Sequence, residues 1–263
     1  MSLIDTSGLE PFADLIKEIY GDLAKPGVQN VGIALSAVLG LGVTLMWPIM
    51  WANERAKIAL ENNLEAYKDR LKDVPPEQIT VAPPEIAMPI LEKMGYVTND
   101  ELKNLYIELL AKASIKDLNN QAHPSFVNII NNLSPDEAKL IQYFIPEDRI
   151  PFIKVRLNLS NNKGGIDIEN PVVIVPNLSL AFPENLGAYI SNLVGVGLLQ
   201  IKEGTYLTDE TNYIPHMEYF ESQKPNYDVI YQAVEKDSNA YEAEKGLIQV
   251  TKLGHMFFNA VYP

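Results

Sequence analysis

The stretch "HPSFVNIINNLSPDEAKLIQYF" (123–144) contains two helix starts and marks the point where the chain changes character. Pro124 and Pro135 each occupy a position expected for the first turn of a helix, where the missing N–H of proline costs no hydrogen bond. At the second start Ser134 is a candidate N-cap, and Glu137 follows at the spacing of a capping box. The stretch therefore predicts one helix after His123 and another over 134–144.

On the N-terminal side of this stretch, apolar residues recur at helical spacing. Segments 9–24 and 52–74 each form one stripe, which in the second contains Ala56, Leu60, Leu64, Tyr67 and Leu71. The proline pairs of "VPPEQITVAPPE" (74–85) stop helices and predict a hinge. Residues 86–132 predict three packed helices, the second opening with Thr98 three residues before Glu101.

On the C-terminal side, β-branched runs replace the helical pattern. The segments "IPFIKVRLNLS" (150–160) and "PVVIVPN" (171–177) predict strands. Residues 183–201 predict a helix that runs into a strand, a Lys202–Glu203–Gly204 turn follows, and "KGLIQVTKLGHMFFNAV" (245–261) predicts a strand and a helix. We therefore expect a mainly α chain with a C-terminal α+β winged-helix-like region, divided into domains 1–74, 75–133 and 134–263.

One segment stands apart from this acidic chain. The run "VGIALSAVLGLGVTLMWPIMWA" (31–52) has no charged residue and, as a helix, would span about 33 Å, enough for the hydrocarbon core of a bilayer. Small side chains recur at every fourth position, which allows membrane helices to approach closely: Gly32, Ser36, Gly40 and Thr44. The lysines and arginines that follow the run outnumber those that precede it, so the positive-inside rule places its C-terminal side in the cytoplasm.

A buried helix of a bundle or of an oligomer interface would explain the same run. Pro48 would kink or end a spanning helix, and the glycines weaken the helix in water. The sequence therefore leaves two alternatives open for 31–52: a long apolar helix in the cell membrane, or a long apolar helix buried in protein.

No residue pattern predicts an enzyme. The chain has no cysteine, which fits a reducing cytosol and excludes thiolate chemistry, and its three histidines, His123, His216 and His255, lack metal-binding spacing. We expect structural roles for them, with His123 stabilising a turn. The acidic pairs Asp136–Glu137, Glu147–Asp148 and Asp209–Glu210 are expected on the solvated surface. We predict no cofactor, no metal and no catalytic residue.

The charge distribution argues against nucleic acid as a partner. The net charge is −13, and residues 182–201, where a recognition helix would lie, contain no lysine or arginine. A winged-helix-like region in such a chain is expected to contact protein, either a partner or a second copy.

Three further segments extend the stretch quoted first. Residues 83–114, "PPEIAMPILEKMGYVTNDELKNLYIELLAKAS", precede it, and "GAYISNLVGVGLL" (187–199) and "LIQVTKLGHMFFNAV" (247–261) follow it. Over about 75–263 this sequence resembles the abortive infection alpha family of bacterial phage-resistance proteins. The most specific part of the resemblance is His123, Pro124, Ser125 and Phe126, with Leu133, Ser134, Pro135, Asp136 and Glu137.

The resemblance implies a part in the bacterial response to phage and carries over no catalytic residue. We expect a non-enzymatic defence protein of the bacterial cytoplasm that acts through protein contacts, attached to the inner face of the cell membrane if 31–52 inserts. The alternative is a soluble oligomeric scaffold or regulator, with a winged-helix-like domain that binds protein or, less readily, nucleic acid.

Overall fold

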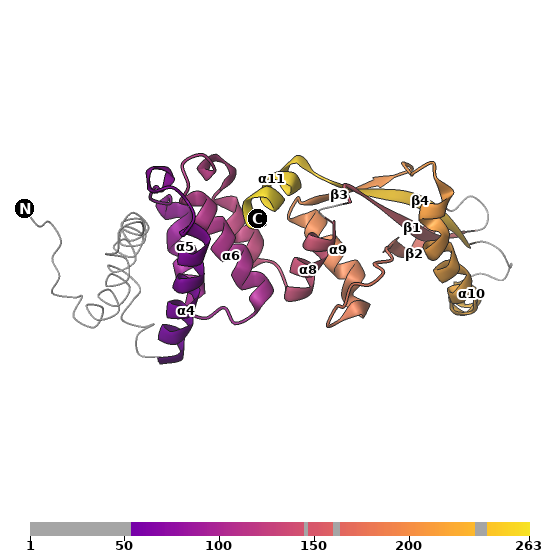
Figure 1. Ribbon diagram of the computed structural model, residues 1–263. Coiled ribbons are helices and arrows are strands. Elements are labelled where there is room, and N and C mark those ends of the chain that lie inside the picture. The colour runs from indigo at the N-terminus through magenta and orange to yellow at the C-terminus, as the bar shows by residue number, and fades with distance from the viewer. Residues whose placement is uncertain (1–53, 145–146, 160–163, 235–240) are drawn as a thin grey trace, which may run out of the picture. The chain divides into compact units, whose positions relative to one another are not determined.

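The computed structural model describes residues 54–144, 147–159, 164–234 and 241–263 (Figure 1). This part of the chain is mixed α/β, with eight α-helices and one four-stranded antiparallel sheet. The chain divides into two compact units. Of the described residues, the helical unit comprises 54–135 together with Met256–Pro263, and the sheet unit lies within Asp136–His255.

Four helices build most of the described helical unit: α4 (Glu54–Leu71), α5 (Pro84–Met94), α6 (Asp100–Ala113) and α7 (Ser125–Asn131). The apolar stripe predicted for 52–74 is buried as expected at Leu60, Leu64, Tyr67 and Leu71. It packs beside α5 and α6, which bury aliphatic side chains of their own. Burial of these side chains is the main stabilising contribution in this unit.

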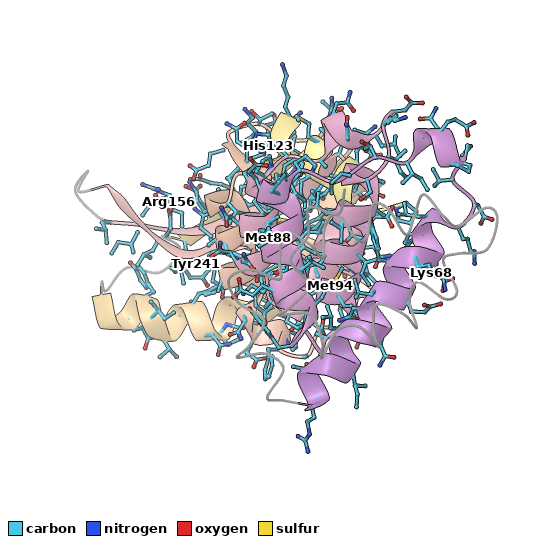
Figure 2. All side chains as sticks on the ribbon, turned by 90° about the vertical axis from the view of Figure 1, so that its left-hand side faces the viewer. Lys68, Met88, Met94, His123, Arg156 and Tyr241 are labelled. Atoms are coloured by element: carbon cyan, nitrogen blue, oxygen red, sulfur yellow. The ribbon has the colours of Figure 1, made fainter. Side chains whose placement is uncertain are left out.

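The few buried polar groups on α4 have partners. Asn63 donates from Nδ2 to the carbonyl of Met94 at 2.7 Å, which satisfies a carbonyl at the end of α5. The Tyr67 hydroxyl lies 2.7 Å from Ser114 Oγ, just after α6. Figure 2 shows Met94, and also Lys68, which pairs with Glu65 at 3.0 Å on the solvated side of α4.

The segments between these helices differ in detail from the sequence predictions. The cap of α6 is Asn99, not Thr98, because Asn99 Oδ1 accepts a hydrogen bond from the Leu102 N–H at 3.1 Å. The proline-rich segment contains a 3₁₀ turn (Pro76–Gln78), and Ile79 then forms an isolated antiparallel bridge with Ile115. This segment is therefore held to the end of α6.

The last helix, α11 (Lys252–Val261), contributes its C-terminal part to the helical unit. Phe257 is fully buried and meets Phe126 edge to face, with ring centroids 5.4 Å apart. Lys112 of α6 donates to the carbonyls of Asn259, at 2.6 Å, and Tyr262. A cation at the carbonyl end of a helix is favourable for its dipole, so Lys112 fixes the end of α11.

The sheet unit contains β1 (Arg149–Asn158), β2 (Gly165–Val172), β3 (Leu199–Glu203) and β4 (Tyr241–Val250), in the order β2-β1-β4-β3 (Figure 1). Its helices are α8 (Pro135–Phe144), α9 (Leu186–Gly195) and α10 (Ile214–Val234). One face of the sheet packs on α10 through an aromatic core that consists of Ile153, Val155, Val172, Tyr213, Phe220 and Tyr227. The seven-residue spacing of the last three residues puts them on one side of α10 and the turn before it.

On the opposite face of the sheet, alternate residues of β1 meet β4 and β3. Phe152 lies opposite Gly246, where an added Cβ would come within 2.1 Å of the phenyl ring, so a glycine is required there. Lys154 is buried and forms ion pairs with Glu244 at 2.9 Å and Glu203 at 3.4 Å. The sheet is therefore apolar and aromatic on one face and carries an ion network on the other.

Three details of the sheet unit differ from the sequence predictions. The strand expected over 171–177 lies mostly earlier, at Gly165–Val172, because this polar edge segment pairs with β1. Residues 205–208, after the predicted turn at 202–204, form no strand; β3 pairs with β4 instead. The 21-residue helix α10, which contains Pro225, had no counterpart among the predicted elements. The winged-helix-like hairpin is thus replaced by strands distant in sequence.

The apolar run 31–52 lies outside the described residues, as does the amphipathic segment 9–24. Among the helices that the structure describes, none combines the length and the apolar character needed to cross a bilayer. The two alternatives for 31–52 stay predictions.

Candidate functional site

The acidic residues of the family motif lie at the start of α8, where Asp136 fixes a distant loop. Its Oδ1 accepts a hydrogen bond from the Ala181 N–H, and its Oδ2 accepts one from the Phe182 N–H, both at 2.9 Å. The Tyr189 hydroxyl of α9 donates to Oδ2 at 3.2 Å. The Asp136 carboxylate therefore holds the segment before α9 against α8.

The protonation of Asp136 follows from these contacts. Burial alone would raise the pKa of the carboxyl, but the two backbone N–H groups, the Tyr189 hydroxyl and the charge of Lys139 together hold the pKa below its usual value. Asp136 is thus an anion, and both of its carboxylate oxygens accept hydrogen bonds from other groups of the protein.

Glu137 is also buried and accepts a hydrogen bond at Oε1 from Asn192 Nδ2 of α9 at 2.7 Å. The prediction that Asp136–Glu137 would be solvated was therefore wrong, because both carboxylates have partners about 45 to 55 residues later. The other two acidic pairs, Glu147–Asp148 and Asp209–Glu210, are exposed as predicted.

The first half of the motif, in the helical unit, acts locally. His123 Nδ1 lies 2.7 Å from Ser125 Oγ and accepts from the Ser125 N–H at 3.2 Å, which satisfies a free N–H of the first turn of α7. Pro124 has helical geometry beside it, and Phe126 is buried. His123 is exposed and has the turn-stabilising role expected from the sequence.

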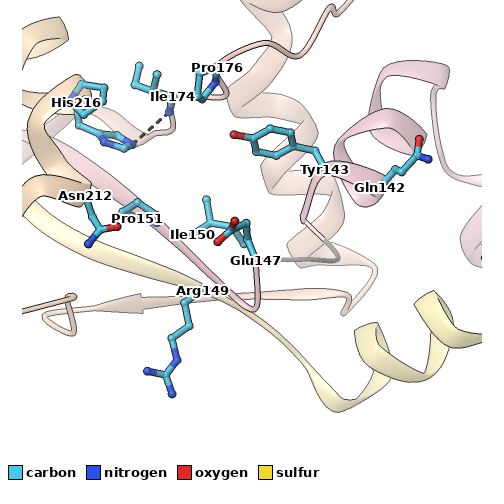
Figure 3. A pocket seen from close by; sticks show the side chains of 11 residues that line it. Gln142, Tyr143, Glu147, Arg149, Ile150, Pro151, Ile174, Pro176, Asn212 and His216 are labelled. Carbon is cyan, nitrogen blue, oxygen red and sulfur yellow. Dashed lines mark hydrogen bonds between the residues drawn. The ribbon is translucent and has the colours of Figure 1, made fainter. Parts of the chain in front are cut away.

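A cavity of about 460 Å³ lies within the sheet unit, with a mainly apolar wall (Figure 3). The wall is formed by Ile150, Pro151, Ile174, Pro176 and Pro215. Tyr143 at the end of α8 and Glu147 before β1 face the same space, and His216 of α10 lines the other side. Cavities of this size and character are typical of small-molecule sites.

His216 is the buried polar group of this cavity, with 3% of its surface exposed. Its Nε2 accepts from the Ile174 N–H at 3.3 Å, which leaves the proton of the neutral ring on Nδ1. Nδ1 is buried and has no hydrogen-bond partner. Burial lowers the pKa of His216, although the carbonyl groups of Asn212 and Pro151 oppose part of this effect, so the ring is neutral at pH 7.

Tyr143 and Glu147 make the opposite side of the cavity polar. Partial burial raises the pKa of the Tyr143 phenol, and the negative charge of Glu147 adds to this effect. Arg149, the one positively charged residue of the lining, extends away from Glu147 and Tyr143 (Figure 3). The polar side chains of the cavity lining are therefore a phenol, a carboxylate, a guanidinium, two amides and a neutral imidazole whose Nδ1 is closed off from solvent.

Groups that could carry other chemistry are sparse in the part of the chain described. No three His, Asp or Glu side chains gather there as a metal site would require. His255 Nε2 lies 3.0 Å from Asp148 Oδ1, but both side chains are about half exposed. The small-residue stripe Gly32, Ser36, Gly40 and Thr44 belongs to the undescribed residues, so no contact can be assigned to it.

Sequence reasoning missed the cavity because its lining comes from three segments that are distant in the chain, 142–151, 174–176 and 212–216. His216 was recognised only as an isolated histidine. The nearest local signal is "YIPHM" (213–217), in which a proline and a histidine follow a tyrosine, and this does not indicate a partner near Ile174.

A family model described as abortive infection alpha matches residues 57–261, which includes both halves of the motif and every residue of the cavity. Neither the curated proteins nor the solved structures include a match to the chain.

Proposed function

The chain belongs to the abortive infection alpha family, and from this premise we propose that it is a non-enzymatic protein of bacterial phage defence that acts through protein contacts. The single observation that carries the proposal is the family match over 57–261. It extends over both units, so the expected role concerns the whole described chain.

The use of the motif residues supports a non-enzymatic role. Asp136 and Glu137 are hydrogen-bonded to Ala181, Phe182 and Asn192, and His123 caps α7. A general acid or base needs a proton that can reach a substrate. The side chains of Asp136, Glu137 and His123 already form hydrogen bonds within the protein. This favours a structural role for the motif, in which it shapes a surface that a partner binds.

We further propose that residues 31–52 attach the protein to the inner face of the bacterial cell membrane. The support is the charge-free length of this run and its stripe of small residues. The competing proposal is a soluble oligomeric scaffold whose sheet unit binds protein, in which the same run is buried between subunits.

The test compares the full chain with a variant that lacks residues 1–53. This deletion keeps all of α4, whereas deletion to residue 74 would remove the buried Leu60, Leu64, Tyr67 and Leu71 from the helical unit. Phage plaque formation, survival of infected cells and membrane fractionation are measured for both forms. We expect the full chain to protect and to sediment with membranes, and the truncated form to do neither.

A full chain that stays in the soluble fraction as a defined oligomer, while protecting cells, would contradict membrane attachment and support the scaffold. Full expression without any effect on infection would contradict the defence role. The double variant D148N/H255A tests the non-enzymatic part, because it removes the exposed imidazole–carboxylate pair. We expect unchanged protection, and complete loss in a folded variant would indicate chemistry at that pair.

A further inference from the structure

We propose that residues 181–183 and the exposed side of α9 form one surface, the α9 surface, on which a second copy of this chain docks with Phe182 as the anchor. The proposal rests on the part of the proposed function that assigns action through protein contacts, and it names the surface and the partner. Three observations in the sheet unit carry it: an exposed phenylalanine on a fixed backbone, a surface almost free of charge, and the strongly negative charge of the chain.

Phe182 is the exposed aromatic side chain of the α9 surface. It has 57% of its surface accessible, whereas the other six phenylalanines that the structure describes are buried. Its backbone is fixed on both sides, because the N–H donates to Asp136 Oδ2 at 2.9 Å and the carbonyl accepts from the Asn185 N–H at 3.1 Å. An aromatic ring on a fixed backbone loses little conformational entropy when a partner covers it, and this is the property of an interface anchor.

The residues around Phe182 are apolar or neutral. Ala181 and Pro183 are exposed on either side of it. The exposed residues of α9 (Figure 1) are small and uncharged: Gly187, Ala188, Ser191 and Gly195. In the described part of the chain, an added Cβ at Gly187 or Gly195 would meet no atom within 4 Å, so this side of α9 is open to a second helix.

The distribution of charge indicates which partner fits this surface. Across 176–201 the sole charged residue is Glu184, whereas the following segment, 202–228, contains eight, six of them acidic. A basic partner would be attracted to the acidic regions and not to this one. A second copy has the same net charge of −13 and is repelled except where both surfaces lack charge. The α9 surface therefore fits a second copy.

The order of residues along α9 is compatible with a twofold pair. Ser191 lies four residues from both Gly187 and Gly195, so an antiparallel pair centred on Ser191 places Gly187 of one copy opposite Gly195 of the other. The two Glu184 side chains then lie at opposite ends of the contact, about 20 Å apart. This separation exceeds the screening length of about 8 Å at physiological ionic strength, so Glu184 does not oppose pairing.

Cross-linking tests the proposal directly. The chain has no cysteine, so a single introduced cysteine is a unique probe. Ser191→Cys is compared with Ser222→Cys in the full chain, in the same non-ionic detergent and with a short bismaleimide. Both serines are exposed and donate to a carbonyl of their own helix, which makes the two variants a matched pair. We expect the Ser191→Cys chain to form cross-linked dimers at least about tenfold faster.

Removal of the anchor gives a second readout. Phe182→Ser keeps the backbone N–H that donates to Asp136, so the loop stays in place. We expect the dissociation constant of the dimer, measured by analytical ultracentrifugation, to rise at least about tenfold. Tyr206→Ser is the matched control, because Tyr206 is 54% exposed and lies after β3, outside the α9 surface. It should leave the dissociation constant unchanged.

Three outcomes would overturn the proposal. Equal cross-linking at the two cysteines would mean that the copies meet elsewhere. Slow alkylation of Ser191→Cys by N-ethylmaleimide, without dimers, would mean that another part of the same chain covers the α9 surface. A cross-link from Ser191→Cys to a different protein in intact cells would mean that the partner is not a second copy.

These failures are distinguishable from failure of the proposed function. A chain that protects infected cells but does not dimerise through Ser191→Cys contradicts the self-association surface. A chain that dimerises there but has no effect on phage plaque formation contradicts the defence role and supports the surface.

Discussion

The two helix starts of the family motif look alike in sequence but act over different distances. His123 and Ser125 satisfy a donor within their own turn, two residues away and in solvent. The buried Asp136 carboxylate instead accepts hydrogen bonds from two backbone N–H groups outside its own helix, 45 and 46 residues later in the chain. A polar residue beside proline thus has a different role in each unit. His123 forms a local cap in the helical unit, whereas Asp136 forms a long-range tie, a set of hydrogen bonds to a distant segment, in the sheet unit.

The difference shows that a short helix-start pattern predicts a helix, but it does not predict how much its polar residues contribute to the free energy of unfolding. An exposed cap exchanges one hydrogen bond with water for one within the protein, whereas a buried carboxylate that is removed leaves several donors unpaired. Four experiments test whether the two starts differ in this way.

The largest expected effect is that of Asp136→Ala. The change leaves the Ala181 and Phe182 N–H groups without their acceptor, so the free energy of unfolding should fall by about 2–4 kcal/mol. Urea denaturation measures it, with Glu184→Ala as the matched loss of an exposed acidic side chain. A loss of unfolding free energy below about 0.5 kcal/mol would mean that Asp136 contributes no more to stability than an exposed cap such as His123.

The second test uses pH. The pKa of Asp136 is lowered in the folded state, so the carboxylate stabilises the protein above the ordinary carboxyl pKa of about 4, and this contribution is lost as the pH falls below it toward the folded-state pKa. Asp136→Asn should therefore be less stable than the wild type at pH 6, with a gap that narrows toward pH 3. Urea midpoints at several pH values measure the gap; a constant gap would mean that the charge of Asp136 has no role.

The third test is Asn192→Ala, which removes the donor to Glu137 Oε1. We expect a loss of about 1 kcal/mol, because one hydrogen bond to a buried carboxylate disappears. Thermal unfolding is compared with Ser191→Ala, which removes an exposed hydroxyl from the next position of α9. Equal melting temperatures would show that Glu137 finds its stabilisation elsewhere.

The smallest expected effect is that of His123→Ala, about 0.5–1 kcal/mol, the usual cost of losing an exposed cap. His123→Asn offers a shorter side chain that can still accept from the first turn, and it should recover most of the loss. Were His123→Ala to destabilise as strongly as Asp136→Ala, the contrast between local cap and long-range tie would fail.

How much of this could be predicted depends on whether the information is local. The α4 stripe from Leu60 to Leu71 was predicted from its helical periodicity and strand β1 from its β-branched residues, because both signals lie within one segment. Strand β2 was misplaced and α10 was missed, since an edge strand pairs on one side only and α10 contains Pro225 among mixed apolar and charged residues. Their stability comes from partners, not from local pattern.

The candidate sites show the same limit. The role of His123 was predicted because its partner is two residues away. The burial of Asp136 could not be predicted, because its main hydrogen-bond donors are backbone N–H groups, which leave no signal in the sequence. The cavity near His216 needed the register of the sheet, which brings Ile174 and α10 together.

The contribution of α11 to the helical unit has a consequence for synthesis on the ribosome. Phe257, which packs on Phe126, and the carbonyl of Asn259, which binds Lys112, are translated only after the whole of Asp136–His255. The helical unit therefore stays open on this side while more than a hundred residues emerge, and the core is completed last. A stop codon directly after His255 would release a chain that has every residue of the sheet unit but lacks the part of α11 that completes the core of the helical unit.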